Sequence, residues 1–210
     1  MVEAVPFSKE GVRGFLHRPE DASGAGLVLT HGAGVNSNAP LLAALANVFA
    51  GAGLCVLRCD LPFRQRRPSG PPSPAGAAAD RAGLQSAVAA LREIVPGPIF
   101  LGGQSYGGRQ ATMLAADAPA IAAALLLLSY PLHPPGKPAQ LRTQHFPRLR
   151  LRSVFVHGTA DPFGSLDEMK SALALIPVPT RIIPVAGAGH DLRRGRFDPG
   201  PVVAALLKPA

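Results

Sequence analysis

Residues 103–107 of the chain read Gly-Gln-Ser-Tyr-Gly, a G-x-S-x-G pattern. The pattern follows a short apolar run at residues 99–101 and opens an alanine-rich stretch at 105–116 that is typical of a helix. A sharp strand-to-helix turn here strains the central residue, and side chains two residues before and after it would collide, so both positions require glycine. The Ser105 hydroxyl would then stand above the strand's carboxyl end, beside a helix N-terminus that favours negative charge.

The same motif also fits a simple glycine-rich turn in which Ser105 only caps the helix. A catalytic hydroxyl needs a base that is held by an acid, and in this topology the chain order is Ser, then Asp or Glu, then His. Asp161 and His190 each follow an apolar run, at residues 154–156 and 181–185. Ligands bind at the carboxyl edge of open α/β sheets, so we predict Ser105, His190 and Asp161 as nucleophile, base and acid.

A second glycine-rich turn, His-Gly-Ala-Gly at residues 31–34, follows another apolar run. Such a turn can aim a backbone N–H group at a developing oxyanion, so we predict the N–H groups of Ala33 and Tyr106 as the oxyanion hole. The alternative is a dinucleotide-binding turn with Asp60 as the ribose-binding acid. Against that alternative, Ser37 replaces the third glycine of the motif, and two expected strands precede the strand that leads into the turn.

Other polar side chains compete for roles at the site. Asp167 is an alternative acid, but it lies in the first turn of an expected helix with a capping box, where acidic charge stabilises the helix. Arg109 is either a ligand for an anionic substrate group or a surface residue. The remaining histidines are expected to be structural or to border the pocket: His17 and His157 in the first role, His133 and His145 in the second. Their spacing predicts no metal site, and we expect no cofactor.

Apolar runs alternate with helical stretches along the chain. The expected strands are residues 3–7, 12–17, 27–30, 54–58, 99–101, 122–128, 154–156 and 181–185. The expected helices are residues 40–50, 77–95, 105–116, 165–176 and 202–207. This alternation favours an α/β fold, with a mostly parallel twisted sheet of about eight strands flanked by helices and an antiparallel start. We expect a single domain over residues 1–210, with two proline-rich loops at 61–76 and 131–152.

The amino-acid composition limits the classes of partner that this protein is expected to bind. Of the 210 residues 47% are hydrophobic, which excludes a disordered chain, and aromatic residues make up only 5% with no Trp, which argues against base stacking. The formal net charge is +8. Arginine gathers in three short clusters: Arg64, Arg66 and Arg67; Arg148, Arg150 and Arg152; Arg193, Arg194 and Arg196. None forms a helical stripe, so we expect no nucleic-acid partner and attribute this charge to solubility and steering.

Cys55 and Cys59 lie four residues apart on one expected strand. At this spacing their Cα atoms are about 13 Å apart, whereas a disulfide needs less than about 7 Å. Two buried free thiols fit a reducing compartment. The first ten residues show no signal pattern, and the longest apolar run, 121–128, is far shorter than the ~20 residues that span a bilayer. We therefore expect a soluble cytoplasmic protein with no membrane partner.

These motifs resemble the α/β-hydrolase superfamily over nearly the whole chain, and within it the small dienelactone-hydrolase-like branch. Residues 107–109, 129–138 and 158–164 are similar to a group that includes testis-expressed hydrolase-like proteins and a subunit of a chromatin histone-acetyltransferase complex. The elbow resembles that of the serine enzymes, whereas dienelactone hydrolases proper place Cys where this chain has Ser105. The chromatin relative implies that the fold can also serve as a scaffold.

Together the motifs predict a serine hydrolase of carboxylesterase or thioesterase type, acting through an acyl-enzyme on a small-molecule acyl substrate. Residues 129–153 are too few for a lid domain, so we expect an open cleft and small or water-soluble substrates. Two alternatives remain: a non-catalytic binding or scaffold protein with the same fold, and an anion- or nucleic-acid-binding protein that uses the arginine clusters.

Overall fold

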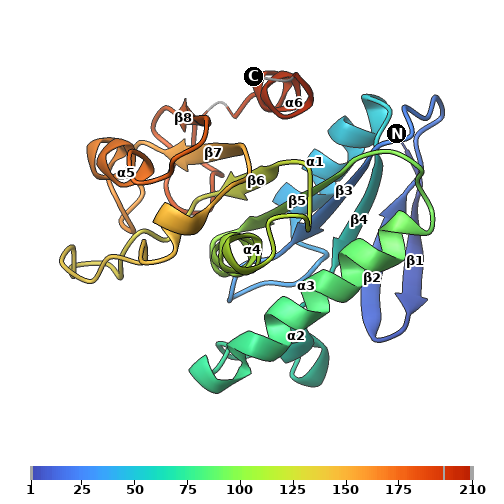
Figure 1. Ribbon diagram of the computed structural model, residues 1–210, viewed down its shortest axis with the longest axis horizontal. Coiled ribbons are helices and arrows are strands. Elements are labelled where there is room, and N and C mark those ends of the chain that lie inside the picture. The colour runs from blue at the N-terminus through green and yellow to red at the C-terminus, as the bar shows by residue number, and fades with distance from the viewer. Residues whose placement is uncertain (1, 196, 209–210) are drawn as a thin grey trace.

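One eight-stranded sheet forms the centre of the computed structural model, which describes residues 2–195 and 197–208. The strands lie in the order β1-β2-β4-β3-β5-β6-β7-β8 (Figure 1). Their bounds are β1 (Ala4–Lys9), β2 (Val12–His17), β3 (Gly26–Thr30), β4 (Cys55–Cys59), β5 (Ile99–Gln104), β6 (Leu125–Leu128), β7 (Ser153–Gly158) and β8 (Thr180–Val185). β1 pairs antiparallel with β2, and β2 with β4; all later pairs are parallel. The predicted sheet with an antiparallel start is confirmed.

The parallel register aligns the carboxyl ends of six strands, β3 to β8, at one edge of the sheet. Thr30 at the end of β3 pairs with Gly103 on β5, and Gly158 at the end of β7 pairs with Val185 on β8. Loops that leave these ends therefore come together, although they are far apart in the chain.

Helices cover both faces of the sheet, as the alternation of apolar runs predicted (Figure 1). The helices are α1 (Pro40–Gly51), α2 (Pro62–Arg66), α3 (Ala77–Arg92), α4 (Tyr106–Asp117), α5 (Leu166–Leu173) and α6 (Gly200–Leu207). Side chains of α1 and α6 pack on one face, and those of α3, α4 and α5 on the other. Successive strand residues alternate between the two cores, as Phe100 and Leu101 do. Of the helices in the described part of the chain, none combines the length and apolar character needed to cross a membrane.

The two proline-rich segments are less irregular than predicted. Helix α2 and a 3-10 helix, Pro74–Gly76, lie in the first segment, and a second 3-10 helix, Phe146–Arg148, lies in the other. The expectation of plain loops was wrong because Pro62, Pro74 and Pro147 stand in the first turn of these helices. In the first turn of a helix a backbone N–H group makes no bond within the helix, so a proline, which lacks this group, is tolerated there.

Cys55 and Cys59 bound β4, and both thiols are buried and unpaired, as their spacing predicted. Burial raises the pKa of both, to about 12 for Cys59, so both thiols stay protonated at neutral pH.

Candidate active site

Ser105 stands in a strained turn between β5 and α4. Its φ of 49° and ψ of −114° lie where non-glycine residues are rare, and such a conformation costs on the order of 1–3 kcal/mol. Glycines on either side permit the turn. A Cβ at Gly103 would lie 2.7 Å from the carbonyl carbon of Gly107, and one at Gly107 would lie 2.5 Å from the His31 carbonyl oxygen. The structure thus places Ser105 in the elbow that the glycine spacing predicted.

Two loops from other strand ends bring their side chains to Ser105. The Ser105 hydroxyl donates to Nε2 of His190 at 2.8 Å. His190 Nδ1 donates to the Asp161 carboxylate, at 2.8 Å from Oδ2 and 3.0 Å from Oδ1. The Asp161 side chain has no exposed surface, whereas the imidazole is 23% exposed. The three side chains that the sequence singled out therefore form one hydrogen-bonded chain from a buried carboxylate to a partly exposed hydroxyl.

The surroundings of Asp161 fix its carboxylate. Oδ1 accepts the Phe163 N–H group at 2.9 Å, and the Phe163 ring stacks on the His190 imidazole with centroids 4.0 Å apart. Behind the carboxylate, buried His157 donates from Nε2 to the Gly164 carbonyl at 2.7 Å. The predicted structural role of His157 is confirmed. Sequence reasoning missed Phe163, although an Asp whose side chain accepts from the N–H two residues on is a recognisable turn signal.

The predicted oxyanion donors flank the hydroxyl. Tyr106 is the first residue of α4, so its N–H group has no intrahelical acceptor. The loop after β3 packs against the elbow, because a Cβ at Gly32 would lie 3.4 Å from the Ser105 Cβ. Ala33 follows on that loop, and within the described residues its N–H group has no backbone or side-chain acceptor. Within the described residues, two N–H groups without an acceptor therefore belong to segments that meet at Ser105.

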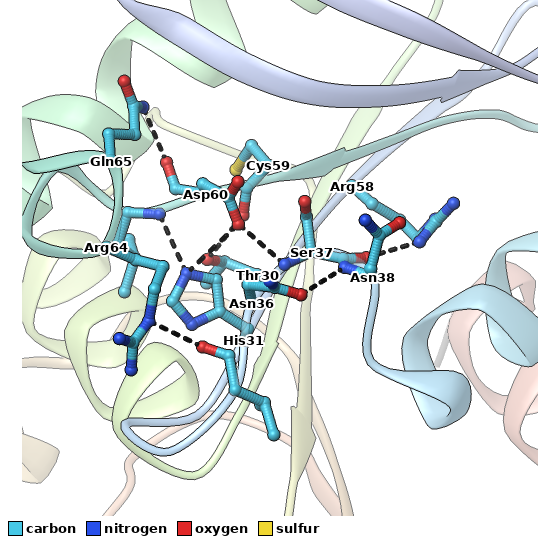
Figure 2. A network of polar contacts seen from close by, with 12 residues as sticks. Thr30, His31, Asn36, Ser37, Asn38, Arg58, Cys59, Asp60, Arg64 and Gln65 are labelled. Carbon is cyan, nitrogen blue, oxygen red and sulfur yellow. Dashed lines mark hydrogen bonds and ion pairs between the residues drawn. The ribbon is translucent and has the colours of Figure 1, made fainter. Parts of the chain in front are cut away.

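A polar network holds the loop after β3 from behind (Figure 2). His31 donates from Nδ1 to the Gly32 carbonyl at 2.8 Å, and its Nε2 accepts the Leu61 N–H group at 3.0 Å. Burial lowers the pKa of His31, which keeps the ring neutral, so its 3.7 Å contact with Asp60 is not an ion pair. The Asp60 carboxylate instead accepts the Ser37 N–H group at 2.7 Å. In the dinucleotide-binding alternative, this same carboxylate would have to bind the ribose.

Arg64 ties the same loop to α2. It is 7% exposed, and its guanidinium donates to the carbonyls of Ala33 at 2.6 Å and Val35 at 3.0 Å (Figure 2 shows the side chain). Two further bonds reach the carbonyls of Arg67 and Gly70, each at 3.2 Å. Assigning Arg64 to a solubility cluster was therefore wrong, because a run of arginine letters does not tell which of them turns inward.

The other arginine clusters also divide between structure and surface. Arg152 donates to the Ala205 and Leu206 carbonyls near the end of α6, at 2.7 and 2.6 Å. Arg148 pairs with Asp117 at 2.9 Å on the surface. Arg193 and Arg194 line a cavity at Ser105, and Arg196 lies outside the described residues.

The Tyr106 side chain points away from the reaction centre. Its hydroxyl donates to Oδ2 of fully buried Asp80 at 2.7 Å, while Oδ1 of Asp80 accepts the Phe63 N–H group at 2.9 Å. Burial and the Asp80 carboxylate raise the pKa of Tyr106, so the phenol stays neutral. The phenol is therefore occupied by Asp80, and the backbone N–H group is the part of Tyr106 that we expect to act on an oxyanion, although the residue also lines a cavity at Ser105.

Two cavities meet at Ser105. The first, of about 630 Å³, is lined by His190, Arg193 and Arg194, and the second, of about 720 Å³, by Arg81, Arg109 and Arg142. Ala33, Ser105 and Phe163 line both. The only helix between β6 and β7 is the three-residue 3-10 turn, so no separate lid domain covers them.

Some residues weighed as site members lie elsewhere. His133 and His145 were expected to border the pocket, but they line neither cavity. His145 is buried and shares a hydrogen bond of 2.8 Å with the Thr112 hydroxyl, and burial with nearby Arg109 lowers its pKa to about 4. His17 accepts from Arg58 Nε at 2.9 Å, the structural role that was predicted. Asp167 is exposed and pairs with Lys170 at 3.2 Å in the first turn of α5, whose capping box is confirmed.

Both the sequence and the fold of this chain have relatives among known proteins. A family model described as the alpha/beta hydrolase domain matches residues 23–199. A dienelactone hydrolase from Anabaena variabilis is 21% identical, with a TM-score of 0.71 over 99% of this chain and 94% of that one. Est1E from Butyrivibrio proteoclasticus with bound ferulic acid is 15% identical, with a TM-score of 0.75 over 97% and 96%. XC6422 from Xanthomonas campestris, described as a serine hydrolase without lid, is 13% identical, with a TM-score of 0.69 over 92% and 88%. At these identities the solved structures show a shared fold.

Proposed function

Because the chain belongs to the alpha/beta hydrolase domain family, we propose that it is a serine hydrolase that cleaves a small carboxylic ester or thioester through Ser105, His190 and Asp161. The observation that carries the proposal is the hydrogen-bonded chain of these three side chains, 2.8 Å at each step. Both links are within the reach that proton transfer requires before any substrate binds.

In the first half of the proposed reaction, Ser105 Oγ attacks the acyl carbon while its proton moves to His190 Nε2. The carbonyl oxygen becomes an oxyanion that the N–H groups of Ala33 and Tyr106 would stabilise. The bond to the leaving oxygen or sulfur then breaks, and the His190 proton passes to that atom. Asp161 stabilises the imidazolium and keeps Nδ1 as the protonated nitrogen.

In the second half, a water molecule gives a proton to His190 and attacks the acyl-enzyme carbonyl. The bond to Ser105 Oγ breaks, the proton returns to the serine, and the acid leaves. The net reaction consumes one water per acyl bond. We propose one small acyl compound as the only partner, dissolved in the cytoplasm, without nucleic acid or membrane.

A panel of 4-nitrophenyl esters tests this proposal. We expect the purified protein to cleave the acetate and butyrate with higher kcat/KM than the palmitate, because arginines line both cavities and a long alkyl chain packed against them would desolvate their charges. Exclusive cleavage of long-chain lipid esters would contradict the proposed substrate class. No cleavage of any ester, together with no reaction with a fluorophosphonate, would leave a non-catalytic protein with this fold.

Arg64 is a positioning residue in this proposal, and its removal is a second test. In Arg64→Met the carbonyls of Ala33 and Val35 lose their donor, so the Ala33 N–H group shifts from its place beside Ser105. We expect kcat to fall about 10- to 100-fold, as for a misplaced oxyanion donor, with KM changed less than about threefold.

Arg66→Met is the matched control, because Arg66 is exposed on the same helix. It should leave both constants near wild type. A purely structural role for Arg64 would instead lower the melting temperature of Arg64→Met while the folded enzyme kept its kcat.

A further inference from the structure

Three guanidinium groups from three separate segments gather at the second cavity. Arg81 comes from α3, Arg109 from α4, and Arg142 from the segment between β6 and β7. All three are partly buried, and the described residues that line this cavity include no Asp or Glu. The rest of the lining is largely apolar, with several prolines and alanines and Met113. The cavity therefore concentrates positive charge in poorly hydrated surroundings.

None of these charges is neutralised within the described part of the chain. No ion pair there involves Arg81, Arg109 or Arg142. Arg81 donates only to the Gln110 side-chain oxygen and Arg142 only to the Pro131 carbonyl, both at 3.2 Å. Arg109 Nε is buried and has no acceptor among the described residues. The Arg109 side chain makes no hydrogen bond or ion pair among the described residues although it lines the cavity, and an anion bound there would supply an acceptor for its terminal N–H groups.

The groups around Arg109 supply no neutralising negative charge. Burial first, and then the Arg109 charge, lower the pKa of Arg142. His145 also faces Arg109 and is neutral, and Tyr130 is buried with a raised pKa. Asp80, the carboxylate on the neighbouring turn of α3, is fully buried and already bonded to Tyr106 and Phe63. Among the described residues, no carboxylate lines this cavity or forms an ion pair with Arg109.

The arrangement at Ser105 tells which part of a substrate reaches these arginines. His190 protonates the leaving group, so the leaving group lies in the cavity that His190 lines. The acyl group then extends into the second cavity, past Tyr106. The backbone N–H group of Arg109 donates to the Ser105 carbonyl at 2.9 Å. Arg109 therefore lies one helical turn after Ser105, a rise of about 6 Å along the axis of α4. Residues one turn apart lie on the same side of a helix, and both residues line the second cavity, so a short acyl chain on Ser105 would extend toward Arg109.

We infer that the second cavity is an acyl-group subsite for a carboxylate, and that the substrate is a half-ester or half-thioester of a short dicarboxylic acid. This inference rests on the proposed hydrolase function and assigns its substrate class. A planar carboxylate matches the paired N–H groups of a guanidinium, and Arg109 is the principal ligand because, unlike Arg81 and Arg142, its side chain has no hydrogen-bond acceptor among the described residues.

Two esters of equal length test the inference. Mono-4-nitrophenyl adipate carries the terminal carboxylate, and 4-nitrophenyl methyl adipate is its uncharged counterpart. We expect wild type to prefer the charged ester by about 30-fold or more in kcat/KM, and Arg109→Gln to lower that ratio about 30-fold, the value of one charge-assisted hydrogen bond. Arg13→Gln removes the same charge from an exposed position on β2 and should leave the ratio within about twofold.

Three results would overturn the inference: no preference in wild type, an equal fall for both esters in Arg109→Gln, or the same fall in ratio in Arg13→Gln. Calorimetry with monomethyl adipate separates the two proposals. Binding that Arg109→Gln abolishes, without hydrolysis of either ester, keeps the anion subsite and removes the hydrolase proposal. Hydrolysis of both esters without preference would keep the hydrolase proposal and remove the anion subsite. Tighter binding of butyl phosphate than of monomethyl adipate would contradict the assignment to a carboxylate.

Discussion

Replacing Ser105 by alanine is expected to lower kcat for a 4-nitrophenyl ester by about 10³-fold or more. The substitution removes the oxygen that forms the acyl-enzyme but leaves the N–H groups of Ala33 and Tyr106 in place. Only the contribution of oxyanion stabilisation and binding then remains. KM should change little, because the hydroxyl stabilises the transition state far more than the bound ester.

Ser129→Ala is a matched control for this experiment. Ser129 also has a φ of 49° and lies at the end of a strand, but it lines neither cavity. Removing its hydroxyl should leave kcat near wild type. If Ser105→Ala kept wild-type activity while Ser129→Ala lost it, Ser105 would be removed from the mechanism.

Replacing Asp161 by asparagine should lower kcat by about 10³- to 10⁴-fold at neutral pH. The amide NH₂ that replaces one carboxylate oxygen cannot accept the Nδ1 proton of His190. The imidazole then favours the tautomer with its proton on Nε2, and it can no longer accept from Ser105 at the present 2.8 Å contact. The overall shape of the site is preserved, so the melting temperature should change little although kcat falls strongly. Steady-state kinetics on the same ester measure the effect.

The rival acid serves as the control for this prediction. Asp167→Asn changes an exposed carboxylate that pairs with Lys170, and it should leave kcat unchanged. A large loss in Asp167→Asn with full activity in Asp161→Asn would show that the acid had been assigned to the wrong residue.

The elements that position the site were predictable because their signals are local. Apolar runs bounded by Gly and Pro predicted the strands, and the strand ends predicted which loops meet. Ser105, Asp161 and His190 could be singled out because each directly follows its own strand, and parallel strands end at one edge. The structure brings these side chains together, while their catalytic roles stay predictions. The narrower resemblance to testis-expressed and chromatin-associated proteins also stays a prediction.

The remaining features depend on tertiary packing that the sequence does not encode locally. Arg64 holds the loop after β3 through bonds to carbonyls about 30 residues away, and no pattern around Arg64 distinguishes it from exposed Arg66. His145 faces Thr112 instead of a cavity for the same reason. Arg81, Arg109 and Arg142 come from three separate segments, and only the packing of α3 against α4 brings them to one cavity. No local sequence pattern predicts this grouping.

Covalent labelling is the most direct test of the proposal that Ser105 is an activated nucleophile. The native protein is incubated with a fluorophosphonate, digested and analysed by peptide mass spectrometry, with His190→Ala in parallel. We expect one phosphonylated peptide, modified at Ser105, in the wild type and a reaction at least about 100-fold slower in His190→Ala. An unlabelled wild type, or equal labelling with and without His190, would contradict the account.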